Sequence, residues 1–338
     1  MATRPERDAA LADSATRVSK ATRIQMTDLA VNQRPMEAKQ SRVLLIGAGA
    51  TGLPVAAALL QADVALDIAT RTRFEHLQVD GPNDLTVAYT VAVHTEAESV
   101  ASYDGRFHDT VILATRTSQD KAVTEWLRSA VGPDTVVVAL QSGVDHEDRL
   151  RSMVLPTTPI IPAVVYTHSE RSEAGLAEVT GDIQIVIPHG AHSDEIQELF
   201  SGTFLEVQVT DNFRTIAWQK MVVNSSLGIM SVLTGKPPRA FADEGANSIL
   251  LALLEEASAV ACADGADLGD DFAQKLAEAI PRISPDNLPT IAIDRAAGRE
   301  TEWQARNAAI VRIASSHGIS VPLHNLGTTL IRVGEPGN

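Results

Sequence analysis

Short apolar segments alternate with helix-forming segments through the first two thirds of the 338-residue chain. Four of these segments are apolar almost throughout and rich in β-branched residues: 43–46, 64–69, 110–114 and 135–140. Continuous apolar runs of this length are typical of strands buried on both faces of a parallel sheet. Less regular strand-like runs extend the pattern at 85–93, 159–166 and 183–187. The pattern therefore predicts one parallel sheet with crossover helices, extended by a few irregular strands.

The character of the chain changes after about Phe213, where apolar residues begin to recur at helical spacing. We expect helices over four segments: 216–233, 246–263, 272–280 and 299–316. Strand-like runs disappear, so the sequence predicts a sheet-forming domain over 41–210 and an all-helical domain over 211–333. Residues 1–40 carry scattered charges without an apolar stripe, and we expect them to form a disordered leader.

The first predicted strand leads directly into a glycine-rich turn and then a helix. The turn consists of Gly47, Ala48, Gly49, Ala50, Thr51 and Gly52. In this setting a G-x-G-x-x-G match gives a tight turn, lets backbone N–H groups approach a pyrophosphate, and packs the helix close to the strand. The helix N-terminus favours the anion as well. We therefore predict an α/β protein in which an N-terminal Rossmann-type doubly wound sheet binds a dinucleotide and a C-terminal all-helical domain follows. The alternative is a glycine turn without a ligand.

The end of the second predicted strand bears on the choice of cofactor. An NAD-binding fold places an acid there to hold the ribose 2′-OH, whereas an arginine accommodates a 2′-phosphate. Arg71 follows this strand, and the rival acid Asp67 falls inside it. Arg116 follows the strand at 110–114, on the edge of the sheet where ligands bind. We therefore expect NADPH, with Arg71 ahead of Arg73 as the contact. The alternative is that these two arginines are solvated loop charges and that Arg116 simply faces water.

Composition narrows the classes of partner. The net charge of −15 argues against a nucleic-acid partner, whose phosphates it would repel, but not against a small anionic substrate. No apolar run approaches the ~20 residues that a membrane helix needs. Cys262 is the only cysteine, and the nine histidines show no H-x-x-x-H spacing, so neither a disulfide nor a metal site is expected. We expect a cytoplasmic protein without a membrane partner.

The candidates for chemistry lie in the helical domain. Lys220 and Asn224 are four residues apart and share one helix face, in a largely apolar segment where a charge is costly to bury. Lys220 is either a general acid that protonates a carbonyl oxygen or a lysine that snorkels at the domain edge. Thr290, Asp294 and Glu302 form a second set. Glu302 either complements the dipole of the last predicted helix or orients Lys220 and holds a substrate hydroxyl.

Three segments carry a family resemblance: the glycine fingerprint, the segment WQKMVVN at 218–224, and the run that begins RETE at 299–302 and ends HGISVP at 317–322. They resemble the fingerprints of the ketopantoate reductase (2-dehydropantoate 2-reductase) family, and the resemblance extends over residues 42–333. It implies an NADPH-dependent reductase with a cleft between a Rossmann domain and a helical domain. It also implies that Lys220 protonates the substrate carbonyl oxygen and that Glu302 supports the lysine and the substrate.

The resemblance assigns further residues to the ligands. It implies that Asn224 contacts the substrate, that Thr290 takes the place of a serine that binds the carboxylate, and that Arg71 and Arg116 surround the 2′-phosphate. The hydroxyl of Thr290 can still donate a hydrogen bond, so this change is mild.

Two positions depart from the family pattern. Ser142 stands where the family has an asparagine after the fourth Rossmann strand, and Gly228 replaces a second asparagine one helical turn after Asn224. Each change removes a hydrogen-bonding amide and is expected to leave space in the pocket. A site that loses such partners discriminates less strongly between substrates.

The predicted function is NADPH-dependent reduction of a 2-oxo acid to a 2-hydroxy acid. The leading substrate is 2-dehydropantoate, which would place the protein in pantothenate biosynthesis, and Thr290, Asn224 and Ser142 position it. Two alternatives stay open: a paralogue that reduces a different carbonyl or imine, and a non-catalytic NADPH-binding protein. The sequence also leaves open a homodimer formed through the helical domain.

Overall fold

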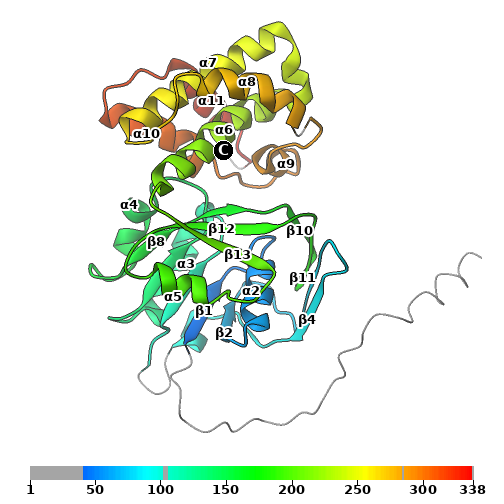
Figure 1. The fold of residues 1–338 in the computed structure, drawn as a ribbon, viewed down its shortest axis with the longest axis vertical. Coiled ribbons are helices and arrows are strands. Elements are labelled where there is room, and N and C mark those ends of the chain that lie inside the picture. The colour runs from blue at the N-terminus through cyan, green and yellow to red at the C-terminus, as the bar shows by residue number, and fades with distance from the viewer. Residues whose placement is uncertain (1–40, 102–105, 284, 337–338) are drawn as a thin grey trace, which may run out of the picture. The chain divides into compact units, whose positions relative to one another are not determined.

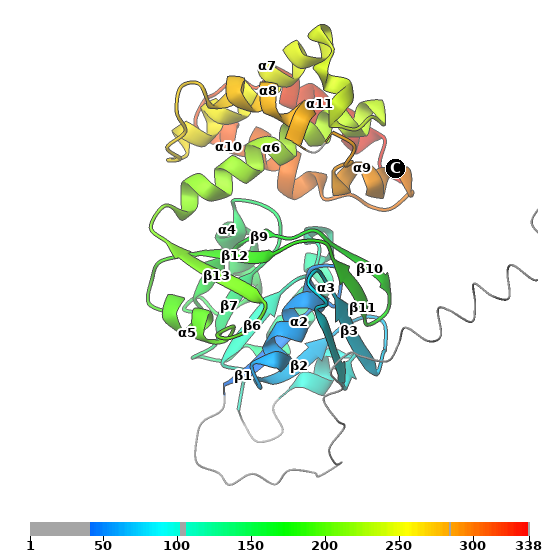
Figure 2. The ribbon, with the colours of Figure 1, turned by 45° about the vertical axis from the view of Figure 1, so that its right-hand side comes forward.

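The computed structural model describes residues 41–101, 106–283 and 285–336, and the predicted leader at 1–40 lies outside them. Within this part of the chain, all strands and the helices between them lie in the segments up to Thr210, and only helices are found from Phe213 onward. Figures 1 and 2 show the two sets of elements in the colours of the chain, blue to green for the strands and green to red for the helices that follow them.

Six parallel strands form the central sheet, in the order β5-β2-β1-β6-β7-β8. They are β1 (Arg42–Ile46), β2 (Ala65–Ala69), β5 (Val93–His94), β6 (Thr110–Leu113), β7 (Val136–Ala139) and β8 (Ile160–Pro162). The chain leaves β1 toward β2 on one side and reaches β6 on the other, so the strand order reverses at β1. Such a switch point is where open α/β sheets bind ligands.

Helices on both faces explain why the strands read as continuous apolar runs. Val43 and Leu45 of β1 pack with α2 (Gly52–Gln61), whereas Leu44 and Ile46 pack in a separate core with α3 (Asp120–Ala130). Successive side chains of a strand point to opposite faces, so β1 must be apolar at every position from Val43 to Ile46 to bury both faces. The prediction of a doubly wound parallel sheet is confirmed.

The irregular strands do not all extend this sheet, and that part of the prediction is wrong. A second sheet has the order β10-β11-β3-β4, and a third has the order β13-β12-β9. Their strands are β3 (His76–Asp80), β4 (Thr86–Thr90), β9 (Val164–Tyr166), β10 (Ser169–Glu173), β11 (Leu176–Val179), β12 (Ile183–Pro188) and β13 (Leu205–Thr210). The sequence analysis missed β13, although LEVQVT alternates strictly between apolar and polar residues and its Leu205 and Val207 are buried.

Short helical pieces connect the strands. They are η1 (Ala97–Val100), η2 (Thr117–Gln119), α4 (His146–Leu150), η3 (Arg151–Met153) and α5 (Ser193–Glu198).

The helical domain is built around α6, which begins three residues after the last strand. Its elements are α6 (Phe213–Thr234), η4 (Pro238–Ala242), α7 (Glu244–Ala263), α8 (Phe272–Ile283), α9 (Thr290–Ala296), the π-helical turn η5 (Gln304–Ala308), α10 (Ala309–Ser316) and α11 (Pro322–Val333). Trp218 on α6 is fully buried in the core of this domain, and its indole Nε1 donates to Asp264 Oδ2 over 2.7 Å.

Two details of the helical prediction are wrong. The segment 299–316 is not one helix, since residues 299–302 lie outside the helical part. The backbone N–H and the hydroxyl of buried Thr301 donate to the Glu335 carboxylate over 3.0 and 2.6 Å and hold these residues there. Helix α11 was not expected, since the residues that it turns inward include His324, Gly327 and Thr328, which weakens the apolar period.

The expectation that no apolar segment approaches membrane length is wrong for helix α7, which has 20 residues. Among the described helices it is the one long and apolar enough to cross a membrane by length and composition. One of its faces nevertheless packs into the core of the helical domain through Leu250, Leu253, Leu254 and Ala257.

Candidate active site

The glycine-rich turn has a geometry that depends on glycine at two positions and leaves open space at a third. Gly47 has φ +107°, and a Cβ there would lie 2.9 Å from the backbone carbon of Ala114. A Cβ on Gly52 would lie 1.8 Å from Gly47 O, so only glycine lets α2 start this close to the turn. A Cβ on Gly49 would meet no atom within 4 Å, so the space beside it is open to a ligand. These three positions fit the turn, packing and approach roles of a dinucleotide fingerprint.

The second sheet reaches this turn, a feature that the sequence analysis missed. On β10, Ser169 Oγ donates to Ala50 O over 2.8 Å, and Arg171 Nη1 donates to Ala48 O over 3.4 Å. Two carbonyl oxygens of the turn are thereby held in hydrogen bonds. Arg171 adds a positive charge beside the loop that is expected to bind phosphates.

The rival acid Asp67 is fully engaged elsewhere. Its carboxylate accepts from Arg42 Nε over 3.1 Å and lies 2.8 Å from His108 Nε2 and 3.2 Å from His94 Nε2. Burial alone would raise the pKa of Asp67, but these hydrogen bonds and the Arg42 charge outweigh burial and hold the pKa well below its usual range. Arg71, by contrast, is exposed directly after β2. The end of β2 thus presents a cation to solvent.

Arg116 is directed toward the helical domain. Its Nη1 lies 2.9 Å from Asp294 Oδ2 and its Nη2 lies 3.0 Å from Asp294 Oδ1, and Arg299 contacts the same carboxylate over 2.8 Å. The candidate Asp294 therefore sits between two guanidinium groups rather than in the cavity described below. The contact of Arg116 with a 2′-phosphate stays a prediction.

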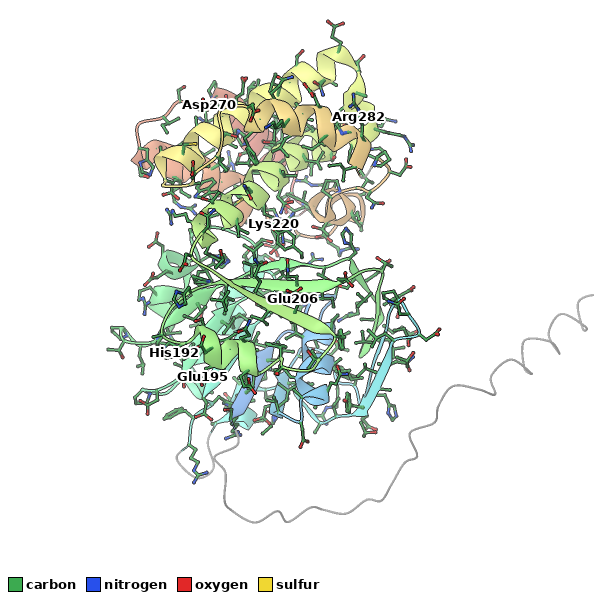
Figure 3. All side chains as sticks on the ribbon, viewed as in Figure 1. His192, Glu195, Glu206, Lys220, Asp270 and Arg282 are labelled. Atoms are coloured by element: carbon green, nitrogen blue, oxygen red, sulfur yellow. The ribbon has the colours of Figure 1, made fainter. Side chains whose placement is uncertain are left out.

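Lys220 lies on α6 where that helix approaches the third sheet (Figure 3). Its Nζ donates to Val165 O and lies 5.1 Å from the centroid of the Tyr166 ring. Burial, assisted by the charge of Arg306 and opposed by the carboxylate of Glu302, lowers the pKa of Lys220 to about 8. A group with this pKa is mostly protonated near pH 7 yet releases its proton readily, as a general acid must.

Arg306 is the residue that sequence reasoning missed. Its Nη2 lies 3.2 Å from Glu302 Oε2, 3.2 Å from Thr290 Oγ1 and 3.3 Å from Ser142 Oγ. One guanidinium thus brings together three of the predicted site residues. The signal was available: Arg306, like Lys220, is a charged residue within a largely apolar helical stretch, and it lies four residues after Glu302.

Glu302 contacts Arg306 and Thr117, whose N–H and hydroxyl donate to Oε1 over 3.1 and 3.3 Å. Within the described residues no hydrogen bond joins Glu302 to Lys220, so in this structure the carboxylate acts on the lysine through its charge. The proposed direct support of Lys220 by Glu302 stays a prediction.

One cavity unites the substrate end of the site. It is lined by Leu140, Gln141, Ser142, Gly143, Ala163, Val164, Val165, Ala217, Lys220, Met221, Asn224 and Arg306. The predicted residues Lys220, Asn224 and Ser142 therefore line the same cavity. Thr290 and Glu302 do not line it, but both accept a hydrogen bond from Arg306, which does. No group of three potential metal ligands was found among the residues that the structure describes.

Gly228 does not leave the space that the sequence suggested. A Cβ at this position would lie 3.3 Å from Ile291 Cγ2 on α9, so a larger residue would require Ile291 to move. An apolar side chain, rather than empty volume, occupies the region beyond Gly228.

Comparison with known proteins identifies the family. Residues 43–192 match the family model described as Ketopantoate reductase PanE/ApbA, and residues 212–335 match the model for its C-terminal part. Together the two models cover well over half of the chain. The chain belongs to the ketopantoate reductase family. The predicted family is thus confirmed, and members of this type are oxidoreductases that act on a CH–OH group.

Two relatives named 2-dehydropantoate 2-reductase illustrate this kinship. The protein of Caulobacter vibrioides is 34% identical over 290 residues, covering 86% of this chain and 97% of its own. That of Mycobacterium tuberculosis is 30% identical over 297 residues, covering 87% and 98%. A PanE/ApbA family ketopantoate reductase from Ralstonia eutropha JMP134 has a solved structure with a TM-score of 0.77 and 25% identity, covering 87% and 98%.

More distant structures share the fold of the ketopantoate reductase family. A dimeric ketopantoate reductase from Staphylococcus aureus has a TM-score of 0.76 at 20% identity and covers 87% of this chain and 98% of its own. D-mandelate dehydrogenase, solved with NADH and anilino(oxo)acetate, has a TM-score of 0.74 at 19% identity and covers 86% and 97%. At these identities the likeness establishes the fold alone.

Proposed function

We propose that this protein reduces 2-dehydropantoate to pantoate with NADPH, a step of pantothenate biosynthesis. The observation that carries the proposal is the partly buried Lys220, whose pKa is about 8, in a cavity lined by Asn224, Ser142 and Arg306. The relatives that are 30–34% identical over most of the chain and are named for this reaction support it.

The cofactor end of the proposal rests on residues that fit a dinucleotide. Gly47, Gly49 and Gly52 admit the pyrophosphate at the start of α2, and Arg71 binds the 2′-phosphate. The saturation of Asp67 by Arg42 and two histidines favours NADPH over NADH, because no free acid remains on β2 for a ribose 2′-OH. When bound, the cofactor supplies the hydride.

At the substrate end Lys220 donates a proton to the oxygen on C2 as the carbon is reduced. Its ammonium has one hydrogen on Val165 O, which leaves two for the substrate and fixes the direction of the side chain. Asn224, one turn further on the same face of α6, supplies an amide to the substrate. Glu302 stabilises the charged form of the lysine until the proton is transferred.

We further propose a cytoplasmic homodimer. The support is kinship: the relatives are biosynthetic enzymes, and the Staphylococcus aureus protein that shares the fold is described as dimeric.

The decisive experiment is NADPH oxidation in the presence of 2-dehydropantoate, with the wild type, Lys220→Ala and the matched control Lys275→Ala. Lys275 is an exposed lysine on α8, paired with Asp271. Loss of a general acid reduces the rate by about 10²–10⁴-fold, whereas Lys275→Ala should leave it unchanged. Tight NADPH binding without turnover in the wild type would contradict the proposal.

A second candidate is reduction of a different 2-oxo acid. Ile291 packs against Gly228 where the family pattern has an amide, so a substrate group that reaches this region meets an apolar side chain instead of a hydrogen-bonding partner. A panel of branched and aromatic 2-oxo acids separates the two candidates by kcat/KM.

A further inference from the structure

Arg306 is a buried cation whose role the family resemblance does not supply. The residue is 8% exposed and lines the same cavity as Lys220. None of the twelve lining residues is acidic, and among the residues that the structure describes the one carboxylate in contact with Arg306 is that of Glu302. Two cations thus face one carboxylate around a partly buried cavity. Because buried charge is costly unless it is paired, such a cavity favours an anionic ligand.

The guanidinium has donors to spare. All of its side-chain hydrogen bonds in the described part of the chain come from Nη2, at 3.2 to 3.3 Å. Its Nε is buried and has no hydrogen-bond partner among the residues at 41–101, 106–283 and 285–336. Charge-assisted hydrogen bonds are usually shorter, about 2.7–2.9 Å, so the three contacts do not saturate the group. The planar fork of an arginine matches a carboxylate in bidentate fashion.

The neighbours of Arg306 complete an anion site. Ser142 Oγ and Thr290 Oγ1 each accept from Nη2, so the hydrogen of each hydroxyl is available to a second acceptor. These hydroxyls come from the loop after β7 and from the start of α9. A carboxylate bound to the guanidinium of Arg306 could therefore also accept hydrogen bonds from these two hydroxyls.

The local backbone fixes Arg306 in this place. It lies in the middle of the π-helical turn Gln304–Ala308, a rare conformation that occurs often at functional sites. The turn is tied to α6 by Asn307, whose Nδ2 donates to Ser225 O over 2.9 Å, and Glu302 before it is held by Thr117. The side chain is thus positioned before any ligand arrives, which is the condition for precise recognition.

We propose that Arg306, with the hydroxyls of Ser142 and Thr290, binds the carboxylate of the 2-oxo acid. The C2 carbonyl is directly bonded to this carboxylate, so an acid anchored on Arg306 has its carbonyl in the cavity that Lys220 lines. This inference rests on the proposed function for the identity of the substrate. It assigns the main recognition of the acid to a residue outside the motifs that suggested the family.

The test compares a charged and a neutral substrate in the full-length enzyme. The pair is 2-dehydropantoate and 2-dehydropantolactone, its internal ester, which keeps the C2 carbonyl and lacks the negative charge. For Arg306→Gln we expect kcat/KM on the acid to fall by about 10- to 100-fold, chiefly through KM, with the lactone changed by less than about 3-fold. Arg306→Lys should recover part of the loss. Arg282→Gln, an exposed position on α8 distant from Lys220 in Figure 3, is the matched control.

Direct binding gives a second readout. Pantoate titrated into the enzyme with NADP⁺ should bind Arg306→Gln about 10- to 100-fold more weakly, while pantolactone binding stays the same. Equal losses on acid and lactone, or an unchanged KM for the acid, would overturn the inference, since a purely structural role predicts one or the other. Thermal melting and NADPH affinity show whether each variant is folded.

Failure of the proposed function gives a different result. If the wild type reduces no 2-oxo acid, small carboxylates such as oxalate and oxamate are titrated instead, with tryptophan fluorescence as the signal. Binding that Arg306→Gln abolishes would support the anion site without the reaction. No binding of any carboxylate to the wild type would refute it.

Discussion

The two ends of the candidate site are assembled in different ways. The cofactor end is built mainly from six consecutive residues, 47–52, that lead from β1 into the first residue of α2, and its geometry follows from where glycine is required. The substrate end draws on a loop after β7, on α6, on α9 and on the π-helical turn. A contiguous motif depends on local backbone geometry, whereas a dispersed site depends on the packing of the whole fold. At the cofactor end, effects of a substitution on stability should therefore be easier to distinguish from effects on ligand binding than at the substrate end.

The largest effect is expected within the glycine-rich turn. A Cβ on Gly52 would lie 1.8 Å from Gly47 O, so Gly52→Ala should lower the free energy of unfolding by about 1–3 kcal/mol and weaken NADPH binding severely. Urea unfolding and NADPH titration measure the two quantities.

Gly49→Ala is the matched control, because a Cβ there meets nothing within 4 Å. Its unfolding free energy should stay within about 0.5 kcal/mol of the wild type, while NADPH binding weakens. If both variants were equally stable, the assignment of Gly52 to packing and Gly49 to ligand approach would be wrong.

An intermediate effect is expected at the edge of the cofactor end. Arg71→Ala removes the exposed cation after β2 and should weaken NADPH binding by about 10- to 100-fold, with NADH binding nearly unchanged. Parallel titrations with the two cofactors measure this difference. Equal affinity of the wild type for NADH and NADPH would refute the expected preference.

The smallest effect is a shift of the pH profile at the substrate end. With Lys220 as the acid, kcat should fall as the pH rises through about 8, because the ammonium loses its proton. Arg306→Gln removes a positive charge and should move this limb to higher pH, and Glu302→Gln removes a negative charge and should move it to lower pH. Profiles of kcat measured from pH 6 to 10 distinguish these directions; shifts of the same sign in both variants would contradict the electrostatic account.

The same contrast explains what the sequence could predict. The strands around β1 and the glycine turn were readable because a strand buried on both faces must be apolar throughout. Lys220, Asn224 and Glu302 were proposed from motif and spacing, and the structure brings Lys220 and Asn224 to one cavity. The second and third sheets were not foreseen, because their short strands pair with partners distant in the sequence, such as β11 with β3.

The charge of Arg306 in an apolar stretch could have singled it out, but its contacts could not be predicted for a similar reason. Its neighbours Ser142 and Thr290 come from other parts of the chain, and no local period reveals that three elements converge on one guanidinium. The filling of the region beside Gly228 by Ile291 likewise depends on how α9 packs on α6. A glycine in place of a larger residue, as at position 228, therefore does not imply empty space in the folded protein.

The hydrogen bonds from β10 to the glycine turn have a thermodynamic consequence. A phosphate-binding loop that is flexible when empty loses conformational entropy on binding, at about 1–2 kcal/mol for each residue that becomes fixed. Ser169 and Arg171 hold Ala50 and Ala48 through their carbonyl oxygens, so part of this ordering takes place during folding instead. Cofactor affinity thereby becomes coupled to the stability of a hairpin more than a hundred residues further along the chain.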